Sequence, residues 1–583
     1  MNTITLSTEQ QAVINAALNG TSNIACIAAA GSGKTTMLTH LVNHVVKASR
    51  DPEHKKKRVL VLSFNKAAAN DFCEKLVALD PVLFERTESH DLSKTPYKAS
   101  EDVARTFDSW LPKRDGRNWF GGKEGLCLDF NRRKREEGWL RAVETTNTYV
   151  GSLFPKNEWV QSDEASNDSG EDEKDETDTS ISGRLWALWG KCWLDARAYP
   201  STLLSNPFGF DSTDGDHQWS VLRRVFAAFE RWCGASGVWT MCDVYLSLHK
   251  KVTRGGVALE NLREELRADY DLIIVDEAQD NSHMQNDIIQ ALCQGEGRPG
   301  PRLLMVGDPR QCIYEWRGAS PRQLINFANQ TSTIRLDLTT NRRSLPHIVK
   351  RADDVIRSCG YGPDSVALRD GSGLLREGET RASMVQMCVN LSRQGKPLGI
   401  MMLSYANKDK NSISAELLAS GVPHTVDGGS PGNKDVVYAS KRVGMGTARD
   451  VAERTRAAVQ AVRRRPTLAP LLVALLETAQ VNALNETQLL AWYARYKVEC
   501  LKSSFNLSTI HKAKGKEEHI VIVRNPTLRD PTSEVSARMM YVAMTRAKDH
   551  LFVFDVPDDD PYYSEEDTLA PPPVGITDTD YLD

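Results

Sequence analysis

A run of small residues followed by a lysine and two hydroxyls stands near the start of the chain, at positions 28–36. It follows an apolar segment and precedes a helical pattern, the context in which backbone N–H groups and a helix N-terminus bind phosphates. In such a loop Lys34 reaches the β- and γ-phosphates of ATP, and the Thr35 hydroxyl binds Mg²⁺. The alternative is a glycine turn before an ordinary helix. We predict a nucleotide site at Ala30, Gly31, Ser32, Gly33, Lys34, Thr35 and Thr36.

Two acids, Asp276 and Glu277, directly follow the apolar run at 272–275. An acid at the carboxyl end of a parallel strand lies in the ligand crevice of an α/β sheet. We expect Asp276 to hold Mg²⁺, mainly through water, and Glu277 to polarise the water that attacks the γ-phosphate. Taken alone, the two acids could simply mark a strand that leaves the core. Together with the phosphate loop, they favour ATP hydrolysis.

The elements that position these residues read as α/β. Continuous apolar runs at 23–28, 58–64, 271–275 and 302–306 alternate with helical patterns, which predicts a parallel sheet covered on both faces. Similar runs recur at 398–403, 519–523 and 551–554 and predict a second sheet. The predicted fold class is therefore α/β, with two parallel-sheet domains that each carry a mainly helical insertion.

The composition changes along the chain give the predicted domain boundaries. The first insertion is rich in tryptophan, and we expect Trp119, Trp139, Trp186, Trp189, Trp193, Trp219, Trp232 and Trp239 to pack it. An acidic stretch at about 160–182 and the acidic tail are too polar to bury a core and are predicted to be disordered. We predict a first α/β domain at 1–110 and 269–333, a helical insertion at 111–268, a second α/β domain at 334–431 and 501–556, a short helical insertion at 432–500, and the tail at 557–583.

The bulk composition excludes several classes of protein. The 583 residues include 11 cysteines without metal-binding spacing, and the sequence contains no apolar run long enough to span a membrane. The first residues lack the pattern of a signal peptide. We expect a reduced cytoplasmic protein of bacterial or viral origin, or a nuclear one if it is eukaryotic. The formal net charge of −4 does not by itself indicate nucleic-acid binding, but acidic segments can mask a basic groove.

Further segments resemble, in order, the motifs of superfamily 1A helicases of the UvrD/Rep type. They lie at 6–11, 104–110, 306–319, 338–344, 509–517 and 538–548. The resemblance implies two RecA-like motor domains that use ATP and Mg²⁺ to move on single-stranded DNA and to unwind duplexes. It also implies single-stranded DNA and junctions with duplex as partners, together with protein partners in repair, replication or defence. The segment 313–318 is typical of the group that moves 3′→5′.

The resemblance assigns nucleotide contacts by position. Gln311 matches the residue that senses the γ-phosphate, and Arg343 and Arg546 match two arginines that approach it from the second domain. ATP would then hold the two domains together until it is hydrolysed. Gln10 matches an adenine contact, and Glu517 matches a ribose contact. Arg342 replaces a tyrosine that usually stacks on adenine, and a guanidinium plane can also stack there.

The resemblance also implies a track for the DNA strand. Aromatic side chains stack on bases without sequence preference, which suits the aromatic residues of this set. An isolated Trp-Arg pair usually marks core packing, but the surrounding motif favours strand contact. Asp108 stands where the family often has histidine, so a contact there is in question. The predicted strand contacts are Asn65, Lys66, Thr106, Phe107, Tyr314, Trp316, Arg317 and His511.

Two other functions remain open from the sequence. A translocase that remodels nucleoprotein but unwinds little would suit the short insertion at 432–500. A scaffold switched by nucleotide, acting in a repair or defence complex, would need no hydrolysis. The full set of catalytic residues, Asp276, Glu277, Gln311, Arg343 and Arg546, argues against the scaffold.

Overall fold

The computed structural model describes most of the chain in segments separated by gaps. These segments are residues 5–49, 59–81, 84, 103–111, 132–147, 185, 189, 199–203, 215–238, 240–294, 300–315, 318–379, 381–393, 399–405, 407–431, 439–440, 453, 474–476, 478–479, 484–525 and 533–555. Predictions for the acidic stretch at 160–182 and for the tail at 557–583 therefore lie outside the described residues. No helix within the described segments combines the length and apolar character needed to cross a membrane.

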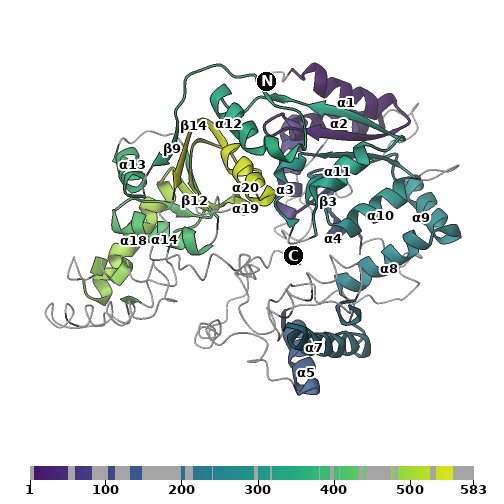
Figure 1. The fold of residues 1–583 in the computed structure, drawn as a ribbon, viewed down its shortest axis with the longest axis horizontal. Helices are drawn as coiled ribbons and strands as arrows, with labels where there is room; N and C mark the ends of the chain where they lie inside the picture. Colours follow the sequence, from purple (N-terminus) through teal and green to yellow (C-terminus); the bar gives the residue numbers. More distant parts are fainter. Residues whose placement is uncertain are drawn as a thin grey trace. The chain divides into compact units, whose positions relative to one another are not determined.

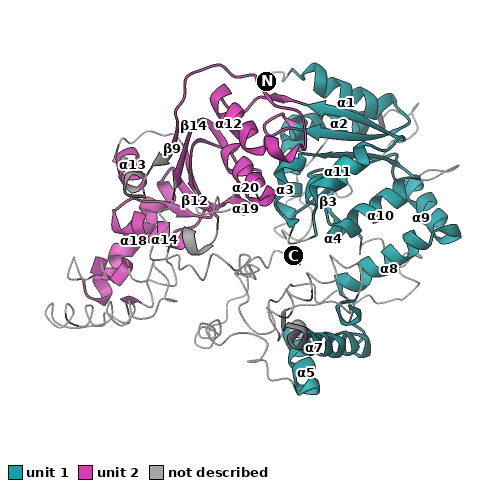
Figure 2. Ribbon diagram, viewed as in Figure 1, with its two compact units in different colours: residues 1–28, 34–338, 565–583 teal, residues 29–33, 339–564 magenta. Residues whose placement is uncertain are grey.

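The chain folds into two compact units, coloured separately in Figure 2. Unit 1 comprises residues 1–28, 34–338 and 565–583, and unit 2 comprises residues 29–33 and 339–564. Each unit contains one six-stranded sheet, and every strand pairing in the two sheets is parallel. The α/β class with two parallel sheets, predicted from the sequence, is confirmed.

The sheet of unit 1 has the strand order β3-β2-β4-β5-β1-β6. Its central strands are the apolar runs of the sequence, and alternate residues of β1 point into two different buried clusters, one on each face. The strands are β1 (Asn23–Ala28), β2 (Val59–Ser63), β3 (Ala104–Thr106), β4 (Leu272–Val275), β5 (Arg302–Gly307) and β6 (Thr333–Leu338). Helices cover the sheet (Figure 1): α1 (Thr8–Asn19), α2 (Lys34–Ser49), α3 (Lys66–Leu79), α4 (Phe107–Trp110), α10 (His283–Cys293) and α11 (Pro321–Ala328).

The predicted domain boundary at 333/334 is wrong by a few residues. Strand β6 pairs with β1 along its whole length, from Asn23 opposite Thr333 to Ala28 opposite Leu338. The strand therefore completes the first sheet, and unit 2 begins after it. Half of β6 is polar and partly exposed because it lies at the edge of the sheet, so it lacks the continuous apolar run by which the central strands are recognised.

The first insertion is helical in its described part. Trp139, Trp189 and Trp219 are buried there, and the Trp139 ring stacks on Phe229 with 3.8 Å between ring centroids. Trp232 is partly buried against the same cluster, whereas Trp119, Trp186, Trp193 and Trp239 lie outside the described residues. That cluster is continuous with one face of the sheet. The elements are α5 (Arg132–Thr146), η3 (Pro200–Thr202), α7 (Gly215–Ala235), α8 (Met241–Arg254) and α9 (Gly256–Asp269).

The sheet of unit 2 has the strand order β11-β12-β10-β13-β14-β9. Its strands are β9 (Leu375–Glu379), β10 (Ile400–Ser404), β11 (Thr425–Val426), β12 (Phe505–Thr509), β13 (Glu518–Asn525) and β14 (Ala547–Asp555). A separate pair is formed by β7 (Thr340–Asn341) and β8 (Val366–Ala367). The helices are α12 (Pro346–Ile356), η7 (Arg357–Cys359), α13 (Arg381–Arg393), α14 (Asn407–Ala419), α18 (Glu486–Lys502), α19 (Ile510–Ala513) and α20 (Glu534–Met544).

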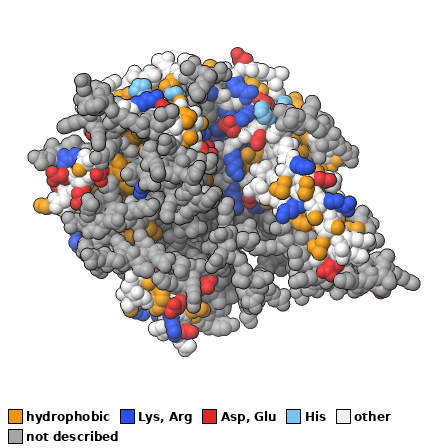
Figure 3. Space-filling view, turned by 180° about the vertical axis from the view of Figure 1, so that it is seen from behind, with side chains coloured by type: hydrophobic (Ala, Val, Ile, Leu, Met, Phe, Trp, Pro, Cys, Tyr) orange, Lys and Arg blue, Asp and Glu red, His pale blue; other side chains and the backbone are white. Residues whose placement is uncertain are grey.

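Charge is nearly balanced in the whole chain, with 73 basic and 77 acidic residues. Both kinds of side chain reach the face drawn in Figure 3. Bulk charge therefore gives no indication of a ligand.

Candidate nucleotide site

The phosphate loop joins β1 to α2. Gly31 and Gly33 have φ angles of +70° and +80°, a left-handed backbone that glycine adopts at low cost. The Ser32 N–H donates to the Ala29 carbonyl at 3.1 Å, which closes the turn. Helix α2 begins at Lys34, so its first N–H groups have no partner within the helix and are oriented to bind an anion.

Lys34 lies between the loop and the acid pair. Its ammonium is 3.4 Å from the Ala28 carbonyl oxygen and 3.8 Å from Oε1 of Glu277, and its side chain is only 10% exposed. Thr35 and Thr36 follow in the first turn of α2 and are half-buried. The structure therefore brings the predicted lysine to the predicted acids, although 243 positions of sequence separate Lys34 from Glu277.

The acid pair ends strand β4. Asp276 is 6% exposed, and its N–H still bonds to the Leu62 carbonyl of the neighbouring strand at 2.9 Å. Glu277 has φ +51°, a conformation uncommon for residues other than glycine, and it turns the chain away from the sheet. The amide of Gln279 donates to Oε2 of Glu277 at 2.5 Å and holds the carboxylate in place.

The charges at this site fit a divalent cation. Burial and the neighbouring Glu277 carboxylate raise the pKa of Asp276, and Lys34 only partly opposes them. Two carboxylates thus share one ammonium, and a cation would relieve their repulsion. Among the described residues no group of three or more His, Cys, Asp or Glu side chains could hold a metal. Mg²⁺ fits such a site, because it commonly uses one or two carboxylates together with substrate phosphates.

Asp308, for which the sequence motifs predict no role, connects the acid pair to Gln311. Its backbone N–H donates to Oε1 of Gln279 at 3.0 Å. Its carboxylate accepts from Nε2 of Gln311 at 3.0 Å and from Nε of Arg310 at 2.9 Å. Burial raises the pKa of Asp308, but Arg310, Lys34 and the bond from Gln311 outweigh burial, so the pKa lies below its usual value.

Asp308 lies in the segment 306–319 and Gln279 follows the acid pair by two positions, but the contacts of both residues depend on tertiary structure. The 3₁₀ turns that carry them are η4 (Ala278–Asp280) and η5 (Pro309–Gln311), and Asp308 caps the second turn. The result is a continuous set of polar contacts from Lys34 to Gln311. Its members are Lys34, Glu277, Gln279, Asp308 and Gln311.

Gln10 has a structural role in α1. Its side-chain carbonyl accepts from the Ser7 N–H at 2.9 Å, and its own N–H donates to the Ser7 hydroxyl at 3.2 Å. This reciprocal capping box fixes the start of the helix. Gln10 is 3% exposed, so a contact with adenine would be made by a side chain that is already anchored.

In unit 2 three of the predicted nucleotide residues lie close together. The Arg343 guanidinium bonds to the Glu517 carboxylate and also donates to the Thr545 carbonyl at 2.9 Å. Glu517 pairs with Lys548 at 3.1 Å as well. Burial raises the pKa of Glu517, but Arg343 and Lys548 outweigh burial and lower it overall. Arg546 is 2% exposed and donates from Nε to the Val542 carbonyl at 2.9 Å.

Arg342 contacts the phosphate loop. Its N–H donates to the Gly31 carbonyl at 2.9 Å, and residues 29–33 belong to the same unit as Arg342. Its Nε atom is buried and has no hydrogen-bond partner within the described part of the chain. This donor can bind a ligand that the phosphate loop brings close.

The predicted strand contacts of unit 1 lie at the carboxyl ends of β2, β3 and β5. Asn65 caps α3 and accepts from the Ala68 N–H at 2.8 Å, and exposed Lys66 follows it. Thr106 caps α4 through a capping box with Ser109. The Tyr314 ring lies 4.8 Å from Phe64 between centroids, at an angle of 31°.

Phe107 differs from the prediction. It is 1% exposed and its ring packs in the core of unit 1, so in this conformation it cannot stack on a base. In unit 2, half-buried His511 lies in the short helix α19. Trp316 and Arg317 lie outside the described residues.

Two protein-family models match parts of the chain, one toward its N-terminus and one toward its C-terminus. The family model of the UvrD/REP helicase N-terminal domain matches residues 6–111 and 192–332, and that of the UvrD-like helicase C-terminal domain matches residues 505–554. A probable DNA helicase II homolog of Mycoplasma capricolum is 24% identical over 363 residues, covering 61% of this chain and 42% of that protein.

Two further relatives are similar over shorter stretches. DNA helicase II of Haemophilus influenzae is 22% identical over 249 residues, which cover 41% of this chain and 32% of the relative. DNA helicase II of Escherichia coli is 30% identical over 139 residues, which cover 23% of this chain and 18% of that relative. The chain thus spans less than half the length of each of these relatives.

Proposed function

We propose that this chain, which belongs to the UvrD/Rep family of helicases, hydrolyses ATP to move along single-stranded DNA. The observation that carries the proposal is the position of the Lys34 ammonium, 3.8 Å from Glu277 and next to Asp276 at the end of β4. Phosphoryl transfer to water needs a phosphate anchor, a metal ligand and a residue that orients the water. Unit 1 alone supplies all three types.

The phosphate loop and the residues of unit 1 divide the chemistry among them. The loop N–H groups and Lys34 bind the phosphates, and Lys34 balances their charge. Thr35 and Asp276 would hold Mg²⁺, which when bound neutralises charge on the phosphate oxygens. Glu277 orients the attacking water and accepts its proton. The bond from Gln279 holds the Glu277 carboxylate close to the Lys34 ammonium.

The same contacts provide a route by which hydrolysis changes the structure. Gln311 is tied to Asp308, and Asp308 is tied through Gln279 to Glu277. Loss of the γ-phosphate changes what Glu277 and Gln311 contact, so the segment after Gln311 can adopt different positions in the two nucleotide states. That segment carries the aromatic residues proposed to contact the strand, Tyr314 and Trp316.

The contributions of unit 2 are proposed from the sequence motifs. Arg343 and Arg546 are assigned to the γ-phosphate, Glu517 to the ribose and Arg342 to the base. The donor at Nε of Arg342 supports the last assignment. Removing an arginine that contacts the γ-phosphate lowers turnover far more than it weakens nucleotide binding. Arg343→Ala and Arg546→Ala therefore test the two assignments separately.

The strand contacts are proposed to be Asn65, Lys66, Thr106, Tyr314, Trp316, Arg317 and His511, with movement 3′→5′. Strand displacement with duplexes that carry a single-stranded tail at either the 3′ or the 5′ end tests this. We expect unwinding of the 3′-tailed duplex only, and none with Glu277→Gln. Unwinding of the 5′-tailed duplex alone would refute the polarity. Translocation along single strands without strand displacement would instead show a motor that remodels nucleoprotein.

A further inference from the structure

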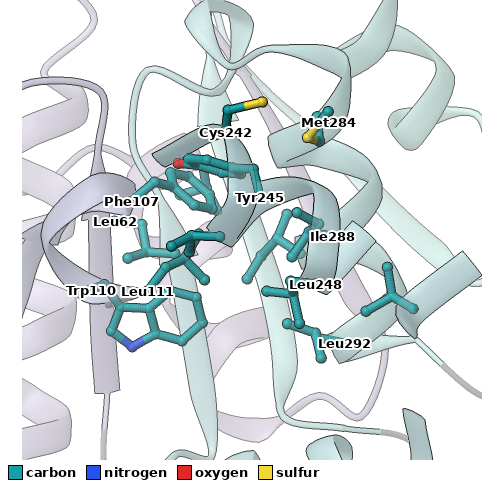
Figure 4. Close-up of a cluster of buried hydrophobic side chains, with 14 of the residues drawn as sticks. Leu62, Phe107, Trp110, Leu111, Cys242, Tyr245, Leu248, Met284, Ile288 and Leu292 are labelled. Atoms are coloured by element: carbon teal, nitrogen blue, oxygen red, sulfur yellow. The ribbon is translucent and has the colours of Figure 1, made fainter. Parts of the chain in front are cut away.

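A buried tyrosine of the helical insertion joins the turn at 106–108 to the first turn of α10. The Tyr245 hydroxyl donates to Oδ1 of Asp108 at 2.6 Å, and it accepts from Nε2 of Gln285 at 3.1 Å. Tyr245 lies on α8 and is 2% exposed. Figure 4 shows its ring beside Phe107, in the cluster that also holds Met284 and Ile288.

Both partners of the phenol are fixed by other bonds. Asp108 lies in the first turn of α4, which Thr106 caps, and Thr106 also ends strand β3. Gln285 forms a capping box with Ser282, in which its carbonyl accepts from the Ser282 N–H at 2.9 Å. The Gln285 amide is therefore used at both ends, and rotating it would break the cap or the bond to the phenol.

The start of α10 is close to both functional segments of unit 1. Ser282 follows Glu277 by five positions, and it forms an antiparallel bridge with Ala319. The His283 N–H donates to the Gly318 carbonyl at 3.2 Å. A shift of this helix end would thus move the segment after the acid pair and the segment after Tyr314 together, because packed interiors transmit displacement.

We propose that Tyr245 is a positioning residue that transmits binding of a single strand at the 106–108 turn to the ATP site, through Gln285 and the start of α10. The inference rests on the proposed function, because it needs a strand that stimulates hydrolysis. The bond from the neutral phenol to a carboxylate is short and charge-assisted, so the turn and the helix are held together more firmly than by packing alone. Asp108 then acts inside the protein and does not contact the strand.

The variant Tyr245→Phe removes the hydroxyl and keeps the buried ring. We expect its ATP turnover without DNA to equal that of the wild type. The ratio of DNA-stimulated to basal turnover should fall about tenfold, the loss expected for one hydrogen bond to a charged group. The KM for ATP should not change.

Tyr199→Phe is the control for the loss of a bond from a tyrosine to a carboxylate, at a ring that is more exposed than that of Tyr245. The Tyr199 hydroxyl also donates to a carboxylate on α8, that of Asp243, at 2.5 Å, and Asp243 in turn accepts from Thr240 in the cap of the same helix. This variant loses the same kind of bond and should keep the wild-type stimulation ratio. A double variant, Asp108→Asn with Tyr245→Phe, should lose no more stimulation than Tyr245→Phe alone, because both changes break one bond.

The outcomes separate the inference from the proposed function. If single-stranded DNA does not stimulate the wild type, the proposed function fails. If it does, and Tyr245→Phe retains the full ratio, the inference is overturned. An equal fall of basal and stimulated turnover in Tyr245→Phe, with a lower Tm, would show a structural role only and would also overturn it. Additive losses in the double variant would count against a shared bond.

Discussion

Replacing Asp308 by Asn removes one charge from the buried contacts that hold Gln311. Asp308 is fully buried and Arg310 is 3% exposed, with Nε of Arg310 and Oδ1 of Asp308 2.9 Å apart. Breaking a buried ion pair from one side costs about 3–5 kcal/mol, because the remaining charge has lost its counter-charge. Asn keeps an oxygen that can accept hydrogen bonds, so we expect a loss near the lower end, about 3 kcal/mol.

The chain contains a control with the same chemistry at the surface. Nε of Arg335 and Oδ1 of Asp337 are 3.0 Å apart and have the same spacing in sequence, but both side chains are more than a third exposed. Exposed pairs contribute about 0–1 kcal/mol, so Asp337→Asn should change the free energy of unfolding by no more than that. The buried pair differs from the surface pair in its burial and in the further bond that Asp308 accepts from Gln311.

Urea unfolding followed by tryptophan fluorescence measures both variants. Eleven of the twelve tryptophans precede position 338, so the signal reports mainly on unit 1. The folded-state pKa of Asp308 is depressed, so its contribution is present above the usual pKa of 3.8 and is lost as the pH falls through the folded value. The difference between wild type and Asp308→Asn should therefore narrow in acid. Equal effects of the two variants, or a loss below about 1 kcal/mol for Asp308→Asn, would refute the reasoning.

Three further changes test other parts of the structure. Glu277→Gln should lower ATP turnover about 100-fold or more while nucleotide still binds, measured by phosphate release and equilibrium binding; undiminished turnover would contradict the role of Glu277. Gly31→Ala should destabilise the protein by about 1–2 kcal/mol and weaken ATP binding, because the backbone of Gly31 has φ +70°. Gly234→Ala is the control and should be neutral or stabilising, because Gly234 lies in α7 and a methyl group there would meet open space. Burial lowers the pKa of His424 from 6.5 to about 4, so its contribution to stability is present above pH 6.5 and is lost as the pH falls toward 4. The wild type should lose about 2 kcal/mol more than His424→Gln between pH 7.5 and 5, and equal losses would refute this.

The central strands of both sheets are evident in the sequence because burial on two faces requires continuous apolar runs. Strands β1, β2, β4 and β5 all meet this condition. Edge strands do not, and β3 with three residues and the half-polar β6 were not predicted. The error in the domain boundary follows directly from β6, because nothing local in its sequence shows which sheet it joins.

In the candidate site, too, some features could be predicted from the sequence and others could not. The residue types of the phosphate loop and the acid pair are local, so Lys34, Asp276 and Glu277 could be chosen from motif and context. The supporting contacts are not local: Gln279 meets Asp308 across 29 positions, and Tyr245 meets Asp108 across 137. Phe107 was predicted from a motif but is buried, because a motif gives the residue type and the surrounding fold decides its exposure.

The most direct test of the central claim is the rate of ATP hydrolysis with no polynucleotide, single-stranded DNA, duplex DNA or RNA, in the wild type and in Lys34→Ala. We expect single-stranded DNA to raise wild-type turnover severalfold, blunt duplex to have no such effect, and Lys34→Ala to stay inactive throughout. Turnover that is indifferent to every polynucleotide, or that survives the loss of Lys34, would contradict the central claim.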